Sequence, residues 1–147
     1  DAIGMQSHMG MDYPDLNEFE ESLEAFAGTG CKVMITEWDM SALPTVNQGA
    51  NVSDTTAYQK QLNPYPDGLP EDIDTKWNNR MADVMRLFMK HSDVITRVTA
   101  WGVSDGDSWK NDWPVRGRKE YPLLFDRDYQ VKPFINTVAA EAKCGDK

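Results

Sequence analysis

Two carboxylates lie near the end of the stretch VMITEWDMS, which runs from Val33 to Ser41. The residues before them are mostly apolar or β-branched, a composition typical of a buried strand. Glu37 and Asp39 are two positions apart, and side chains alternate between the faces of a strand. We therefore expect both acids on one face at the carboxyl end of a strand, where they form a candidate site.

A histidine and a glutamine share one face of an earlier predicted strand, AIGMQSHM, which spans Ala2–Met9. An imidazole from His8 can hydrogen-bond one oxygen of Glu37, and Asp39 and Gln6 are expected nearby. A carboxylate that is held ionised and aimed in this way suits nucleophilic catalysis.

Two other interpretations of these residues stay open. The acids can form a structural ion pair, or His8, Glu37 and Asp39 can be metal ligands. The chain has only two histidines, and the second, His91, ends a predicted helix. We therefore expect neither a metal nor another cofactor.

Tryptophans are dense in and after a third predicted strand, VITRVTAWGVSD, which spans Val94–Asp105. Trp101 lies near its end, Trp109 follows, and Trp113 comes soon after. Exposed indoles at the mouth of a site stack on the apolar face of a sugar ring, while polar side chains bind its hydroxyls. We expect Trp101 and Trp109 to contact a ligand.

These residues need elements to position them, and the pattern predicts a strand followed by a helix, three times over. Helices are expected after an Asp15 cap, after an Asp74 cap and from Pro133 onward. Such alternation predicts an α/β fold with a parallel sheet covered by helices, whose strand ends converge on one site. The long segment 41–73 is expected to form a loop over that face.

Composition narrows the possible partners. The formal charge of −9 repels phosphate backbones, so nucleic acid is not an expected partner. The mean hydropathy is −0.60, and no apolar run approaches the length of a membrane span. The sequence alone does not show whether Cys31 and Cys144 form a disulfide.

Four segments, GMQSHM, VMITEWDM, RVTAWGVSDGDSW and YPLLFDRDYQVKP, occur in this order. Together they resemble the last three βα units, the sixth to the eighth, of the glycoside hydrolase family 10 endo-β-1,4-xylanases, which are (β/α)8 TIM barrels. The resemblance covers nearly all of residues 1–147 and is loosest across 45–75. It implies the C-terminal portion of a catalytic barrel, since a complete barrel takes about 250 residues.

The resemblance also implies roles for individual residues. Glu37 matches the nucleophile of retaining hydrolysis, with His8 and Asp39 as the partners that hold it. Gln6, Trp101 and Trp109 match residues around the bound sugars. Where the family usually has Leu, this chain has Trp38, which is expected to face away from Glu37 and to change packing only.

One part of the family's site is missing from this sequence. The acid/base Glu follows a VNE-type motif on the fourth strand, and nothing here matches it. The resemblance therefore implies a xylanase only with the N-terminal barrel half supplied, on another chain or by swapping. The chain alone is expected to be inactive, and a secreted, periplasmic or cell-surface protein is implied.

Two alternatives remain for the function. The chain can be a catalytically incomplete half-barrel that binds carbohydrate. Alternatively, the full protein can act on β-1,4-glucan instead of xylan, because part of the discrimination between these sugars lies outside this chain.

Overall fold

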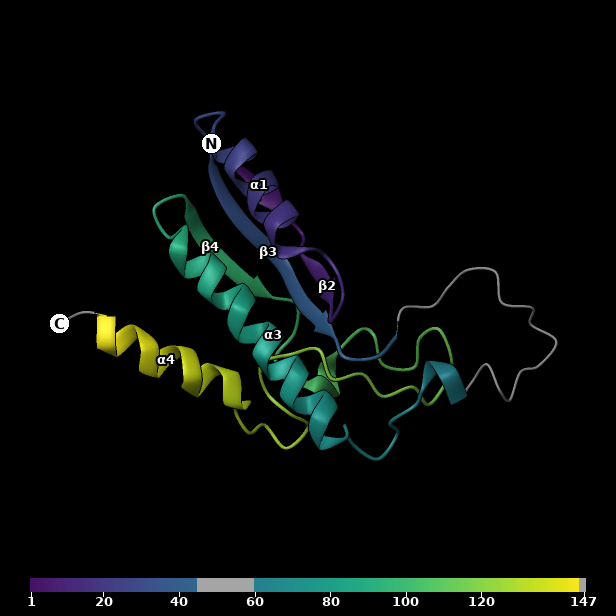
Figure 1. Cartoon of the computed structure of the whole chain (residues 1–147). Helices are drawn as coiled ribbons and strands as arrows, with labels where there is room; N and C mark the ends of the chain where they lie inside the picture. Colours follow the sequence, from purple (N-terminus) through teal and green to yellow (C-terminus); the bar gives the residue numbers. More distant parts are fainter. Residues whose placement is uncertain (45–59, 146–147) are drawn as a thin grey trace.

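The computed structural model describes residues 1–44 and 60–145. Within them, β3 pairs in parallel with β1 and β2 on one side and with β4 on the other. Figure 1 shows α1 and α3 running alongside these strands, with α4 next to α3. In chain order the elements are β1 (Ala2–Met5), β2 (His8–Gly10), α1 (Leu16–Ala27), β3 (Lys32–Ser41), α3 (Glu71–Lys90), β4 (Ile95–Ala100), the 3₁₀ helix η1 (Asp105–Asp107) and α4 (Pro133–Gly145).

The first and third predicted strands have different bounds in the structure. The segment Ala2–Met9 forms two strands, because Ser7 between them has a φ of 69° and leaves the extended conformation. The third strand, predicted as Val94–Asp105, ends at Ala100, two residues before Gly102, whose φ is 142°. Even with the break at Ser7, β2 still places His8 directly opposite Asp39 of β3.

Two of the three predicted helix starts are confirmed. Asp15 caps α1 by accepting the backbone N–H groups of residues 17 and 18, and α4 begins at Pro133. The predicted Asp74 cap of α3 is wrong, because Pro70 is the N-cap and Asp74 already donates its N–H to the Pro70 carbonyl. Pro70 suits the start of a helix because it has no N–H group that would be left without a partner. Asp74 lies in the first turn, where a negative charge interacts favourably with the helix dipole.

The core lies between β3 and the helices. Trp38 is buried against Phe88 of α3 and Phe134 of α4, with ring centroids 5.2 Å and 6.4 Å away. Trp77 is fully buried and donates its indole N–H to the Met40 carbonyl. The expectation that Trp38 packs away from Glu37 is therefore confirmed, and the opposite face of β3 is left for the acids.

The segment predicted as one loop, 41–73, is shorter in the structure. Ser41 still belongs to β3, and α3 begins at Glu71. Residues 45–59 lie outside the described residues. The described part packs on the segment after η1, where Arg118 donates to the Leu62 carbonyl and Tyr121 donates to the Tyr65 carbonyl at 2.5 Å.

No described helix is long and apolar enough to cross a lipid bilayer. Cys31 is partly buried and Cys144 exposed, and both are free thiols. The described residues are held together by the packed core, hydrogen bonds and buried ion pairs.

Candidate active site

One imidazole joins the two acids of β3. His8 Nε2 lies 3.0 Å from Oε2 of Glu37, and His8 Nδ1 lies 3.0 Å from Oδ2 of Asp39. Gln6 adds a long hydrogen bond of 3.4 Å from Nε2 to Oε1 of Glu37. The side chain of Glu37 is 24% exposed, so its carboxylate is restrained on both oxygens while it still reaches solvent.

Asp39 is far more enclosed, with 1% of its side chain exposed. Trp109 donates its indole N–H to Oδ2 at 2.9 Å, and the Lys110 ammonium lies 2.7 Å from Oδ1. The Lys110 contact is an ion pair, because its angles fall outside hydrogen-bond geometry. Lys110 also donates to Ser41 Oγ at 2.8 Å. A buried carboxylate needs such partners, since an unpaired buried charge is strongly unfavourable.

The indoles divide into two groups. The ring centroids of Trp109 and Trp113 lie 6.1 Å apart. The ring centroids of His8 and Trp109 lie 5.5 Å apart, in an edge-on arrangement. Trp109 is 48% exposed, so one aromatic surface stays open beside the acids. Trp101 directly follows β4 and is also exposed, but it does not line the pocket that Trp109 and Trp113 share.

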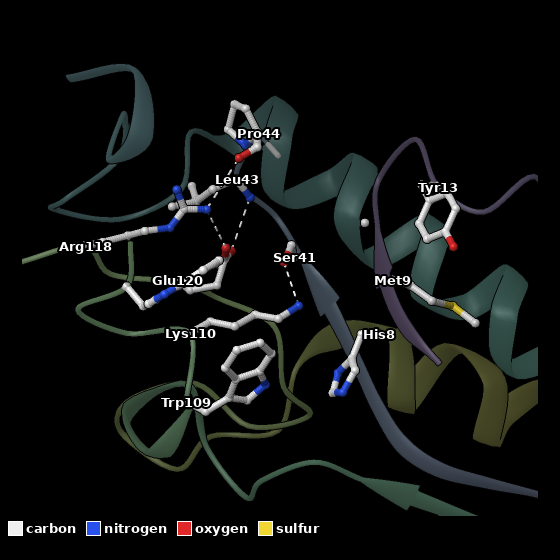
Figure 2. Close-up of a pocket in the computed structure, with 12 residues that line it drawn as sticks. His8, Met9, Tyr13, Ser41, Leu43, Pro44, Trp109, Lys110, Arg118 and Glu120 are labelled. Atoms are coloured by element: carbon white, nitrogen blue, oxygen red, sulfur yellow. Dashed lines mark hydrogen bonds and ion pairs between the residues drawn. The ribbon is translucent and has the colours of Figure 1, made fainter. Parts of the chain in front are cut away.

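A pocket of about 320 Å³ opens next to His8. Figure 2 shows Lys110 reaching Ser41 at the end of β3, with the rings of Trp109 and His8 beside it and Tyr13 across β2. Glu37 does not line this pocket but is joined to it through His8. The lining residues are His8, Met9, Gly10, Tyr13, Ser41, Leu43, Pro44, Trp109, Lys110, Trp113, Arg118 and Glu120.

A buried ion pair fixes the chain where it leaves β3. Glu120 Oε1 accepts the backbone N–H groups of Ala42 and Leu43 at 2.9 Å and 3.2 Å, and Arg118 donates to Oε2 at 3.1 Å. Arg118 also donates to the Pro44 carbonyl at 3.5 Å. These contacts tie the end of β3 to the loop that carries Trp109.

A second buried ion pair, between Lys132 and Asp105, anchors the loop that carries Trp109. Lys132 Nζ lies 2.9 Å from both oxygens of Asp105, and the backbone N–H of Leu123 donates to Oδ1. Burial raises the pKa of Asp105 and lowers the pKa of Lys132, although each partner acts in the opposite direction. The pair holds the loop in one conformation by hydrogen bonds to both of its ends.

Most of the residues predicted from the sequence come together, and one neighbour, Lys110, was not predicted. His8, Glu37, Asp39, Gln6 and Trp109 form one contact network. A signal was available, because Lys110 is the only basic residue between Arg97 and Arg116, in a segment that carries three aspartates.

A parallel α/β sheet with an oriented carboxylate and an open indole at its strand ends is typical of glycoside hydrolases. The model of glycosyl hydrolase family 10 matches residues 1–141, so the chain belongs to that family. The shared fold is accordingly that of a TIM barrel, of which this chain is a part.

Individual relatives agree with this assignment. The chain is 44% identical to "Endo-1,4-beta-xylanase A" of Xylanibacter ruminicola over 94% of its own length and 38% of that protein. It is 32% identical to "Endo-1,4-beta-xylanase B" of Paenibacillus barcinonensis, covering 89% of the chain and 35% of the relative. A solved GH10 endoxylanase from a sugarcane soil metagenome is 41% identical, with a TM-score of 0.79, over 90% of this chain and 37% of that one. The chain therefore spans less than two fifths of the length of these relatives.

Proposed function

We propose that this chain is the nucleophile-bearing part of a retaining endo-β-1,4-xylanase. The observation that carries the proposal is the bridge from His8 to Glu37, which holds the accessible carboxylate of Glu37 in place. In this reaction Glu37 attacks the anomeric carbon of a xylose unit while the glycosidic bond breaks and the leaving oxygen takes a proton from the acid/base group. Water then hydrolyses the resulting glycosyl ester. His8 and Asp39 position Glu37, and Gln6, Trp101 and Trp109 bind sugar.

The acid/base carboxyl group comes from outside this chain. Retaining enzymes place two carboxyl groups about 5 to 5.5 Å apart. Asp39 does not suit the role of proton donor, because it is enclosed and paired with Lys110. We infer that the described strands belong to the sixth to eighth βα units and that the preceding units carry the acid, on the same chain, on another chain or by swapping. The chain that leaves β3 then borders the active-site face, where Leu43 and Pro44 line the pocket.

Xylan is the proposed substrate because an open, indole-lined site suits an internal stretch of a polysaccharide chain. The names of the two curated relatives support the same substrate. Since a polymer of this size does not cross a membrane unaided, we propose a secreted, periplasmic or cell-surface location.

The test uses a chimera in which this chain replaces the matched segment of the Xylanibacter ruminicola xylanase. Glu37→Gln keeps the shape of the side chain and removes its charge. We expect kcat on xylan to fall on the order of 10⁴-fold or more, because the covalent step is lost. Release of xylo-oligosaccharides measures the effect.

Glu21→Gln is the matched control, an exposed acid on α1 whose loss leaves turnover unchanged. Full activity of the Glu37→Gln chimera would exclude Glu37 as nucleophile. Running carboxymethylcellulose beside xylan separates the substrates, and faster turnover of the cellulose derivative would replace xylan by β-1,4-glucan.

A further inference from the structure

The contacts of Asp39 link four side chains, in which basic and acidic groups alternate. Lys110 lies 2.7 Å from Asp39, Asp39 lies 3.0 Å from His8, and His8 lies 3.0 Å from Glu37. We propose that Lys110 is a positioning residue for the nucleophile, acting through Asp39 to keep the proton on His8. This inference rests on the proposed function, because it assigns a partner to the same carboxylate.

The hydrogen-bond geometry of His8 defines where protons are needed. Both ring nitrogens face carboxylate oxygens at 3.0 Å. A neutral imidazole has one N–H and one lone pair, so it can donate to only one of the two acids. An imidazolium donates to both, and hydrogen bonds between charged groups are the stronger ones. Only a ring with an N–H on both nitrogens therefore donates to both acids at once.

The charges of this row balance only when Lys110 is counted. Two carboxylates and one imidazolium leave one net negative charge, and the more enclosed of the two acids is Asp39, with 1% of its side chain exposed. The ammonium of Lys110 neutralises it at Oδ1, while Trp109 supplies an uncharged donor at Oδ2. The other charged residues of the pocket, Arg118 and Glu120, pair with each other.

Loss of the Lys110 charge changes where the proton lies. A buried carboxylate without a compensating cation binds a proton more readily, and the available proton is on His8 Nδ1. Transfer of that proton to Asp39 leaves His8 neutral, with a single N–H still donated to Glu37. Glu37 then faces a neutral partner instead of a cation.

A neutral His8 slows the second chemical step most. In that step a water oxygen bonds to the anomeric carbon, and the ester bond to Glu37 breaks with its electron pair left on the carboxylate. The proton of the water passes to the acid/base group outside this chain. An imidazolium beside Glu37 stabilises the departing carboxylate, so Lys110 sustains turnover from two contacts away.

The test is Lys110→Met in the chimera described above. We expect kcat to fall about 10- to 100-fold, the loss of one charge-assisted contact, with KM unchanged or lower because the glycosyl ester accumulates. Lys110→Arg keeps the charge and should restore the rate.

Lys119→Met is the matched control, an exposed lysine of the same loop whose removal changes the net charge equally. If Lys110→Met does not fold, as judged by thermal unfolding, Lys110→Gln takes its place, because it keeps a donor for Ser41. An unchanged kcat would overturn the inference, as would a loss confined to KM or thermal stability. Failure of the proposed function is separate, because it appears as an active Glu37→Gln variant.

Discussion

Individual side chains at this site serve more than one partner. Asp39 is held from three sides, and two of its partners, Trp109 and Lys110, are consecutive residues of one loop. Trp109 also keeps about half of its surface open to solvent. It therefore joins the wall of the sugar site to the support of the nucleophile, and these two roles can be separated by substitution.

Trp109→Phe tests the supporting role in the chimera. Phenylalanine keeps an aromatic face for a sugar but removes the N–H that reaches Asp39. We expect the free energy of unfolding to fall by about 1.5 kcal/mol, the net value of a hydrogen bond to a charged group. Trp113→Phe is the control, because the indole of Trp113 makes no hydrogen bond among the described residues. Equal losses for the two variants, measured by urea unfolding, would contradict the assignment.

A register shift in β3 and a close backbone approach after β4 position these side chains. β3 shifts register against β4 between Ile35 and Trp38, so that Trp38 joins Ile35 in the core while Glu37 turns to the site. β4 ends beside Gly102, and the chain passes closely over Leu123 at this point. Sheet geometry and a close backbone approach thus aim the site loops.

Gly102→Ala tests that close approach. A Cβ at this position would lie 2.6 Å from Leu123 Cδ1, and the φ of 142° is one that L residues rarely adopt. We expect a loss of about 2–4 kcal/mol in the free energy of unfolding from strain and overpacking together. Gly117→Ala, with a φ of 86° and open space around it, should lose only about 1–2 kcal/mol. The reverse order in chemical denaturation would show that Leu123 moves aside easily.

The described strands form a sheet with open edges, whereas a closed barrel has none. Within the described residues, β1 and β4 each pair only with β3. Val98 of β4 and Val103 after it are exposed. Unpaired strand edges beside apolar side chains favour association with further strands. The chain's span of 38% of its Xylanibacter ruminicola relative fits that property.

We expect the isolated chain to self-associate and to bind xylohexaose without cleaving it. Mixed with the preceding segment of the Xylanibacter ruminicola relative, it should form a one-to-one complex that gains xylanase activity, because new strands cover the open edges. Light scattering after size-exclusion chromatography reports the assembly, and calorimetry reports the binding. A monodisperse, active monomer of the isolated chain would refute the need for a partner.

Much of the site was predictable from order and periodicity alone. The alternation of strands and helices predicts a parallel sheet, and parallel strands bring their carboxyl ends together. Glu37, Asp39 and His8 were selected because each was expected at such an end, on the face that alternation assigns. The start of α4 at Pro133 and the Asp15 cap of α1 were likewise predictable, because local chemistry determines them.

Only the tertiary structure decided what lies beside those residues. The break at Ser7, the extra turn of α3 before Asp74 and the end of β4 before Trp101 depend on backbone geometry that no periodicity reports. Lys110 became part of the site because a loop returns over β3 and places an ammonium against a buried acid. Sequence determines which side chains share a face, since that follows from local backbone repeat. Contacts between segments distant in the chain follow from packing, which the sequence pattern alone does not define.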